Sequence, residues 1–123
     1  MKNNQLMIYG AYGYAGELMV REAVAQGLRP IIAGRDDEKL KPIATELSLE
    51  CRAFGVRNTG SNLQDISVLL NCAGPFSATA EPLARACLAQ QIHYLDITGE
   101  IDIFRKCHAL DEEALSLIHI SEP

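Results

Sequence analysis

Short apolar segments alternate with amphipathic ones along the chain. Five hydrophobic runs are typical of buried parallel strands: residues 5–9, 30–33, 49–54, 67–72 and 92–97. Apolar residues at helical spacing separate them, in 17–26, in 40–47, in a helix opened by Pro82 and in a last helix after Gly99. Strands and helices that alternate with short connections form right-handed βαβ units. The pattern therefore predicts an α/β fold, a doubly wound, Rossmann-type parallel sheet of about five strands with helices on both faces.

Proline and glycine set the expected limits of these helices. Gly27 suits the position just after a helix, where the backbone turns left-handed. Pro42 lies inside the second amphipathic segment, so we expect that helix to start near Lys41 or to follow a tight first turn. Residues 55–62 (GVRNTGSN) have the composition of a loop.

Composition and charge narrow the classes of partner. The 123 residues suffice for one domain, and 11 Lys and Arg against 16 Asp and Glu give a net charge of −5. No basic cluster is present, which argues against a nucleic-acid partner. No apolar run is long enough to cross a bilayer, and the first ten residues lack a signal-peptide pattern. We expect a cytoplasmic protein.

The four cysteines are expected to have a structural role rather than a catalytic or metal-binding one. They lie in or beside apolar segments and form no C-x-x-C pair: Cys51, Cys72, Cys87 and Cys107. We expect buried free thiols in a reducing compartment and no metal site.

The sequence GAYGYAG follows the first strand and opens the first helix. In that place glycines let a dinucleotide pyrophosphate approach the backbone amides of a helix N-terminus. The spacing is G-x-x-G-x-x-G rather than the commoner G-x-G-x-x-G. The predicted cofactor-binding residues of this segment are Gly10, Tyr12, Gly13, Tyr14, Ala15 and Gly16. The alternative is a glycine-rich turn needed only for close strand–helix packing.

The end of the second strand distinguishes NADP from NAD. An acidic residue there would bind the ribose 2′-hydroxyl of NAD. Here the strand ends with Ala33, Gly34 and Arg35, and the Arg35 guanidinium suits a 2′-phosphate. Asp36 and Asp37 follow and look like caps of the next helix. We therefore predict NADP(H), the alternative being that Arg35 is a solvated surface charge.

The loop after the fourth strand is a second predicted contact. Ligands of open α/β sheets lie beyond the carboxyl ends of the strands, so this loop is expected to touch the cofactor. The small residues Ala73 and Gly74 let the nicotinamide ribose lie against the backbone. A plain tight turn is the alternative. At the end of the fifth strand, Asp96, Thr98 and Glu100 are candidates for orienting cofactor or substrate. The alternative for Thr98 is that it caps the helix that follows.

Four segments together resemble a known family. GAYGYAGELMV, IIAGRDDEKL, VLLNCAGPF and HYLDITGE look like the N-terminal NADP-binding domain of saccharopine dehydrogenase-like oxidoreductases, a group that includes the trans-acting enoyl reductases. The resemblance covers residues 5 to about 114. It implies that Gly10, Gly13 and Gly16 hold pyrophosphate and that Arg35 faces the 2′-phosphate. It also implies that Ala73, Gly74 and Pro75 flank the nicotinamide side. Family members continue into a domain for substrate binding and dimerisation.

Residues 115–123 (LSLIHISEP) differ in character from the rest. They resemble one reading frame of a transposon-end adapter used for sequencing libraries. We expect a domain over 1–114 and a non-native tail over 115–123, with the substrate domain missing. The alternative is a natural extension of the last helix.

Two functions remain open from the sequence. The first is the cofactor half of an NADP-dependent oxidoreductase, in which hydride transfer to a small-molecule substrate needs the missing domain. In that case we expect this chain to bind cofactor without turnover, and no catalytic residue is identified. The second is a stand-alone, non-catalytic NADP-binding or redox-sensing module. A short-chain dehydrogenase is disfavoured, because no tyrosine has a lysine four residues on.

Overall fold

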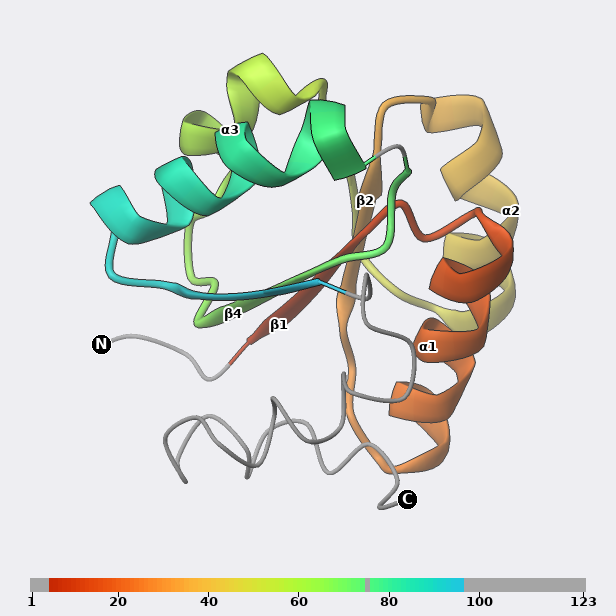
Figure 1. Cartoon of the computed structure of the whole chain (residues 1–123). Helices are drawn as coiled ribbons and strands as arrows, with labels where there is room; N and C mark the ends of the chain where they lie inside the picture. Colours follow the sequence, from red (N-terminus) through yellow and green to blue (C-terminus); the bar gives the residue numbers. More distant parts are fainter. Residues whose placement is uncertain (1–4, 75, 97–123) are drawn as a thin grey trace.

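The computed structural model describes residues 5–74 and 76–96 (Figure 1). The described elements are, in chain order, β1 (Leu6–Tyr9), α1 (Tyr14–Ala25), β2 (Ile31–Gly34), α2 (Asp37–Leu47), β3 (Cys51–Ala53), the 3₁₀ helix η1 (Val56–Asn62), β4 (Val68–Asn71), α3 (Phe76–Ala89) and β5 (His93–Asp96). All five strands pair in parallel, in the order β3-β2-β1-β4-β5. The predicted fold class is confirmed, and the strands lie within two residues of the predicted limits.

The strand order reverses beside β1. The chain winds outward from β1 to β3 and then returns to the other side of β1 as β4. Tyr9, the last residue of β1, is level with Ala33 of β2 and with Asn71 of β4. The loops that follow β1 and β4 therefore leave the sheet next to each other, at the switch point where such sheets bind ligands.

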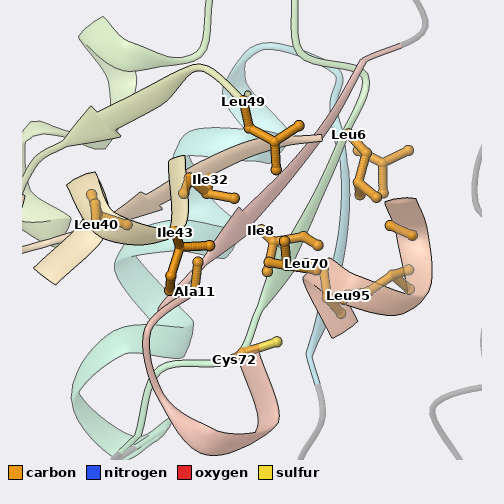
Figure 2. Packing of buried hydrophobic residues seen from close by; sticks show 13 residues of the cluster. Leu6, Ile8, Ala11, Ile32, Leu40, Ile43, Leu49, Leu70, Cys72 and Leu95 are labelled. Carbon is orange, nitrogen blue, oxygen red and sulfur yellow. The ribbon is translucent and has the colours of Figure 1, made fainter. Parts of the chain in front are cut away.

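Helices cover both faces of the sheet (Figure 1). Alternate residues of each strand point to opposite faces, so Leu6 and Ile8 pack with α1 and α2, whereas Met7 and Tyr9 pack with α3 and the segment after η1. Figure 2 shows the first of these two layers, in which Ile32 lies near Leu40 and Ile43, and Leu70 lies beside Ile8. Buried apolar side chains thus cover both faces of the sheet, and the loops at its carboxyl end leave from this packed core.

The helices begin earlier than predicted. α1 starts at Tyr14 instead of residue 17. α2 starts at Asp37, and Pro42 lies inside it. α3 starts at Phe76, so Pro82 lies inside this helix and does not open it. A proline removes one N–H and disturbs one turn, but burial of the apolar stripe on either side of it keeps both helices continuous.

The end of α1 was predicted from its local sequence, whereas the structure of residues 56–62 was not. Gly27 has φ +90° and ends α1, and the N–H of Leu28 donates to the carbonyl of Ala23, which confirms the predicted helix end. Residues 56–62 form a 3₁₀ helix interrupted at Asn58, not the predicted irregular loop. Burial of Thr59 and Leu63 orders this segment against the sheet.

The cysteines are free wherever the structure describes them. Cys72 and Cys87 are buried, as predicted, whereas Cys51 is only half-buried, because β3 lies at the edge of the sheet. Cys107 lies outside the described residues. Among residues 5–74 and 76–96, no three histidine, cysteine or carboxylate side chains come close enough to hold a metal ion. No helix within the same residues is sufficiently long and apolar to span a membrane.

Candidate dinucleotide-binding site

A cleft of about 320 Å³ opens at the carboxyl ends of the strands, where the order of the sheet reverses. The loops after β1, β2 and β4 supply most of its walls, and η1 and α3 supply the rest. The lining residues are Tyr9, Gly10, Tyr12, Gly13, Gly34, Arg35, Val56, Cys72, Ala73, Gly74, Ala78 and Thr79.

Two glycines of the predicted motif are needed for packing. Gly10 has φ +83°, and a Cβ placed on it would lie 2.7 Å from the backbone nitrogen of Ala73. A Cβ on Gly16 would lie 2.0 Å from the carbonyl oxygen of Gly10. Both positions exclude any side chain, whether or not a ligand is bound. The packing interpretation of the motif is thus sufficient for these two residues.

Gly13 is different. A Cβ on it would meet nothing closer than the Gly10 carbonyl oxygen at 3.5 Å, so packing does not require glycine there. Gly13 is exposed, lines the cleft and is the N-cap of α1, where no side chain caps the helix. The first amides of a helix have no acceptor within it, and its N-terminus carries partial positive charge. The bare, uncapped end of α1 therefore fits an anionic group such as a pyrophosphate.

Tyr12 joins the glycine loop to the end of β2. A Cβ on Gly34 would lie 2.6 Å from the Tyr12 ring, so the ring rests directly on the β2 backbone. The Tyr12 hydroxyl accepts a hydrogen bond from the Asp36 N–H at 3.2 Å, and the Lys39 Nζ lies 5.6 Å from the ring centroid. This tyrosine holds the walls of the cleft together, and its phenol is engaged by the protein.

Arg35 lies between two hollows. It is exposed and lines both the main cleft and a more open hollow of about 540 Å³ at the start of α2. The residues of this second hollow are Tyr12, Arg35, Asp36, Asp37, Glu38 and Lys39. Asp36 caps α2 through the Glu38 N–H, and Asp37 pairs with Lys41 at 3.2 Å. The carboxylates of Asp36 and Asp37 therefore have partners of their own, and Arg35 and Lys39 are the cations that line this hollow.

The loop after β4 forms the opposite wall. Ala73 is half-buried and Gly74 is exposed, with nothing within 4 Å of a Cβ placed on Gly74. The neighbouring Cys72 is buried, and burial raises the pKa of its thiol from 9.0 to about 12. The thiol is therefore protonated at physiological pH, so Cys72 is a poor nucleophile. It lines the cleft as an apolar residue.

The structure brings most of the predicted residues together. Gly10, Tyr12, Gly13, Arg35, Ala73 and Gly74 line the one cleft. Tyr14, at 85% exposed, does not line it, and neither do Ala15 and Gly16. Pro75 lies outside the described residues, as do Thr98 and Glu100.

Other lining residues carry no motif. Tyr9, Val56 and Thr79 reach the cleft from β1, η1 and α3, elements far apart in the sequence. Asp96 does not line the cleft, and its carboxylate accepts a hydrogen bond from the Tyr94 hydroxyl. Only the pairing of the strands makes these residues neighbours, so no local signal identifies them.

The family model described as saccharopine dehydrogenase NADP binding domain matches residues 6–119. The chain belongs to this family. Its description names NADP, which confirms the predicted choice of NADP over NAD and the predicted resemblance. The match makes residues 6–119 an NADP-binding domain of this family, and the description names no stand-alone module.

Curated proteins with similar sequences have names from the same group of enzymes. The saccharopine dehydrogenase-like oxidoreductase of Homo sapiens is 25% identical over 117 residues, which cover 77% of this chain and 27% of that protein. A Mycobacterium tuberculosis protein provisionally named a trans-acting enoyl reductase is 25% identical over 118 residues, covering 82% of this chain and 28% of that protein. The chain thus spans about a quarter of the length of these relatives.

Solved structures support the fold. A nucleoside-diphosphate-sugar epimerase from Pseudomonas aeruginosa superposes with a TM-score of 0.64 at 19% identity, covering 76% of this chain and 32% of that one. A reductive aminase from Aspergillus terreus, solved with NADPH, gives a TM-score of 0.54 at 18% identity, covering 77% and 40%. These likenesses show a Rossmann-type fold.

Proposed function

We propose that the cleft at the switch point binds NADP(H) and that this domain supplies the cofactor half of an oxidoreductase. The observation that carries the proposal is the uncapped N-terminus of α1, which opens at Gly13 into the cleft between β1 and β4. The cofactor would supply a hydride. The residues of this chain would bind it and orient it toward a substrate held elsewhere.

The pyrophosphate would lie at Gly13. Its oxygens would accept hydrogen bonds from the first amides of α1, contributed by the backbones of Tyr14, Ala15 and Gly16. This assignment explains why Tyr14 and Ala15 take part although their side chains do not line the cleft: only their N–H groups are used.

The adenosine 2′-phosphate would lie at the second hollow. Arg35 lines both hollows, so its guanidinium is placed to reach a phosphate at the end of β2. A planar guanidinium donates two parallel hydrogen bonds to such a group. Lys39, held over the Tyr12 ring, would add a second positive charge beside it.

The nicotinamide would lie at the opposite wall, against Ala73, Gly74 and Pro75. Ala73 and Gly74 have no bulky side chain, and Gly74 is open to a close approach. No residue of the chain is proposed as a catalytic acid or base. The domain limit at residue 114, the tail at 115–123 and the cytoplasmic location stay predictions.

Titration of the purified chain with NADPH and with NADH, followed by nicotinamide fluorescence, tests the proposal. We expect saturable binding with a lower Kd for NADPH. Arg35→Ala should weaken NADPH binding by about tenfold or more and leave the Kd for NADH nearly unchanged, because a charge-assisted hydrogen bond contributes roughly 1.5–3 kcal/mol.

Arg85→Ala is the matched control. Arg85 is an exposed arginine that pairs with Glu81 on α3, away from both hollows. The Arg85→Ala variant should have the same Kd for NADPH and for NADH as the wild type. Equal losses for NADPH and NADH in Arg35→Ala would remove Arg35 from the 2′-phosphate site, and absence of NADPH binding to the wild type would overturn the proposed function.

A further inference from the structure

Asn71 is a polar residue at a position where the rest of the strand is apolar. It ends β4, after Val68, Leu69 and Leu70, and none of its surface is exposed. A buried amide without hydrogen bonds would destabilise the fold, so an asparagine at such a position needs partners for its amide group. The asparagine therefore has a purpose other than filling the core.

Its amide group is engaged on both sides. The Oδ1 accepts a hydrogen bond from the Ala73 N–H at 2.9 Å. The Nδ2 donates to the Thr79 hydroxyl at 3.0 Å and to the Tyr94 hydroxyl at 3.1 Å. One side chain thus connects the loop after β4, the first part of α3 and strand β5.

Ala73 is held at both of its peptide groups. The Ala73 N–H donates directly to the Asn71 side chain. The Ala73 carbonyl oxygen accepts a hydrogen bond at 2.9 Å from the Thr79 hydroxyl, which itself accepts one from Asn71. The Thr79 hydroxyl accepts from the Asn71 amide and donates to the Ala73 carbonyl, so these two hydrogen bonds strengthen each other. Both backbone polar groups of Ala73 are therefore hydrogen-bonded to side chains.

Ala73 in turn supports the glycine loop. A Cβ on Gly10 would lie 2.7–2.8 Å from the backbone nitrogen, Cα and Cβ of Ala73, so the two loops are in direct contact. Movement of Ala73 would widen the cleft between them. The Tyr94 hydroxyl also donates to the Asp96 carboxylate at 3.1 Å, which ties the end of β5 to the same group of residues.

We propose that Asn71 is a positioning residue that fixes the Ala73–Gly74 wall of the cleft through Thr79, and so determines where the nicotinamide half of the cofactor can lie. The identity of the ligand rests on the proposed function. The arrangement of the wall does not, and the two can be tested apart.

Amide hydrogen exchange of the cofactor-free chain tests the wall. We expect the Ala73 N–H to be protected in the wild type. In Asn71→Leu and in Thr79→Val its exchange should be at least tenfold faster, while amides of β1 keep their protection. Thr79→Ser keeps the hydroxyl and should restore the wild-type rate. Thr79→Val gives the answer if Asn71→Leu does not fold. Unchanged Ala73 exchange in Thr79→Val would overturn the proposal.

Binding of two ligands tests the consequence. NADPH contains the nicotinamide half, whereas adenosine 2′,5′-bisphosphate lacks it. Thr79→Val should raise the Kd for NADPH about fivefold, because binding must then order a wall that the Thr79–Ala73 hydrogen bond holds in place in the wild type. It should leave the Kd for the bisphosphate within twofold of the wild type. Equal weakening of both ligands, or of neither, would overturn the positioning role.

Ile66→Val is the control for lost stability. Ile66 is buried before the start of β4, at the other end of that strand from the cleft. It should lower Tm by several degrees without changing either Kd. If the wild type binds neither ligand, the proposed function fails, and Ala73 exchange still decides whether Asn71 fixes the wall.

Discussion

Glycines of one short motif serve different purposes at the residue scale. Gly10 allows the loop after β1 to touch Ala73, and Gly16 allows α1 to pack on the Gly10 carbonyl. Gly13 has space beside it on the cleft side, so its lack of a side chain matters to what enters the cleft. The motif is therefore partly a folding element and partly a binding element.

Replacement of these glycines by alanine separates the two purposes. Gly16→Ala places a Cβ 2.0 Å from a backbone oxygen, so it should lower the free energy of unfolding by about 2 kcal/mol or more. Gly13→Ala should lower it by less than about 1 kcal/mol, yet weaken NADPH binding. Urea unfolding and NADPH titration of both variants measure these effects. Wild-type NADPH affinity in Gly13→Ala would remove this residue from the pyrophosphate site.

At the scale of elements, the N-termini of α1 and α2 are capped differently. α1 begins at Gly13 with no side-chain cap, whereas the Asp36 carboxylate caps α2 by accepting the Glu38 N–H at 3.0 Å. The capped helix is complete without a ligand and tolerates Pro42 within it. The uncapped helix keeps its amides for an anion. Asp36 confirms the prediction that an aspartate here caps the helix.

Loss of the Asp36 cap should destabilise α2. We expect Asp36→Ala to lower the free energy of unfolding by about 1 kcal/mol, because the Glu38 N–H loses its acceptor. Asp36→Asn keeps an acceptor oxygen and should remain close to the wild type. Thermal or urea unfolding measures both. Equal destabilisation by alanine and asparagine would show that the charge, and not the cap, is what matters.

At the scale of the whole molecule, one cysteine thiol is buried on each face of the sheet. Cys72 belongs to the layer with α1 and α2, and Cys87 belongs to the layer with α3. Burial raises the pKa of both thiols from 9.0 to about 12. Ionisation of either thiol is therefore coupled to opening of the packed core.

Stability should accordingly fall in alkaline solution. Above about pH 9 the unfolded chain releases thiol protons that the native state retains, so the free energy of unfolding should drop by up to roughly 1.4 kcal/mol per pH unit for each thiol. Urea unfolding between pH 7 and 10 measures this slope. Cys72→Ala and Cys87→Ala should each flatten it. A slope unchanged in both variants would show that other groups cause the alkaline loss, such as Tyr94, whose pKa burial also raises.

Local sequence was sufficient for the elements and for part of the site. Apolar runs and helical spacing specify strands and helices through nearby residues, so the sheet, its helices on both faces and the loops after β1, β2 and β4 could be predicted. The glycine motif and Arg35 could also be found, because each sits directly after a strand. Helix starts were missed at Pro42 and Pro82, since burial along the helix outweighs the local penalty of proline.

The remaining features depend on which strands become neighbours. β1 and β4 are separated by most of the domain, and only their pairing places Ala73 against Gly10 and Thr79 within reach of the cleft. The same pairing of β4 with β5 brings Tyr94 to Asn71. Hydrophobic periodicity indicates which residues of a strand are buried. It does not indicate which strands pair with each other, because many strand orders would bury the same residues. The choice of partners is made by packing of the whole chain, and that choice builds the walls of the cleft.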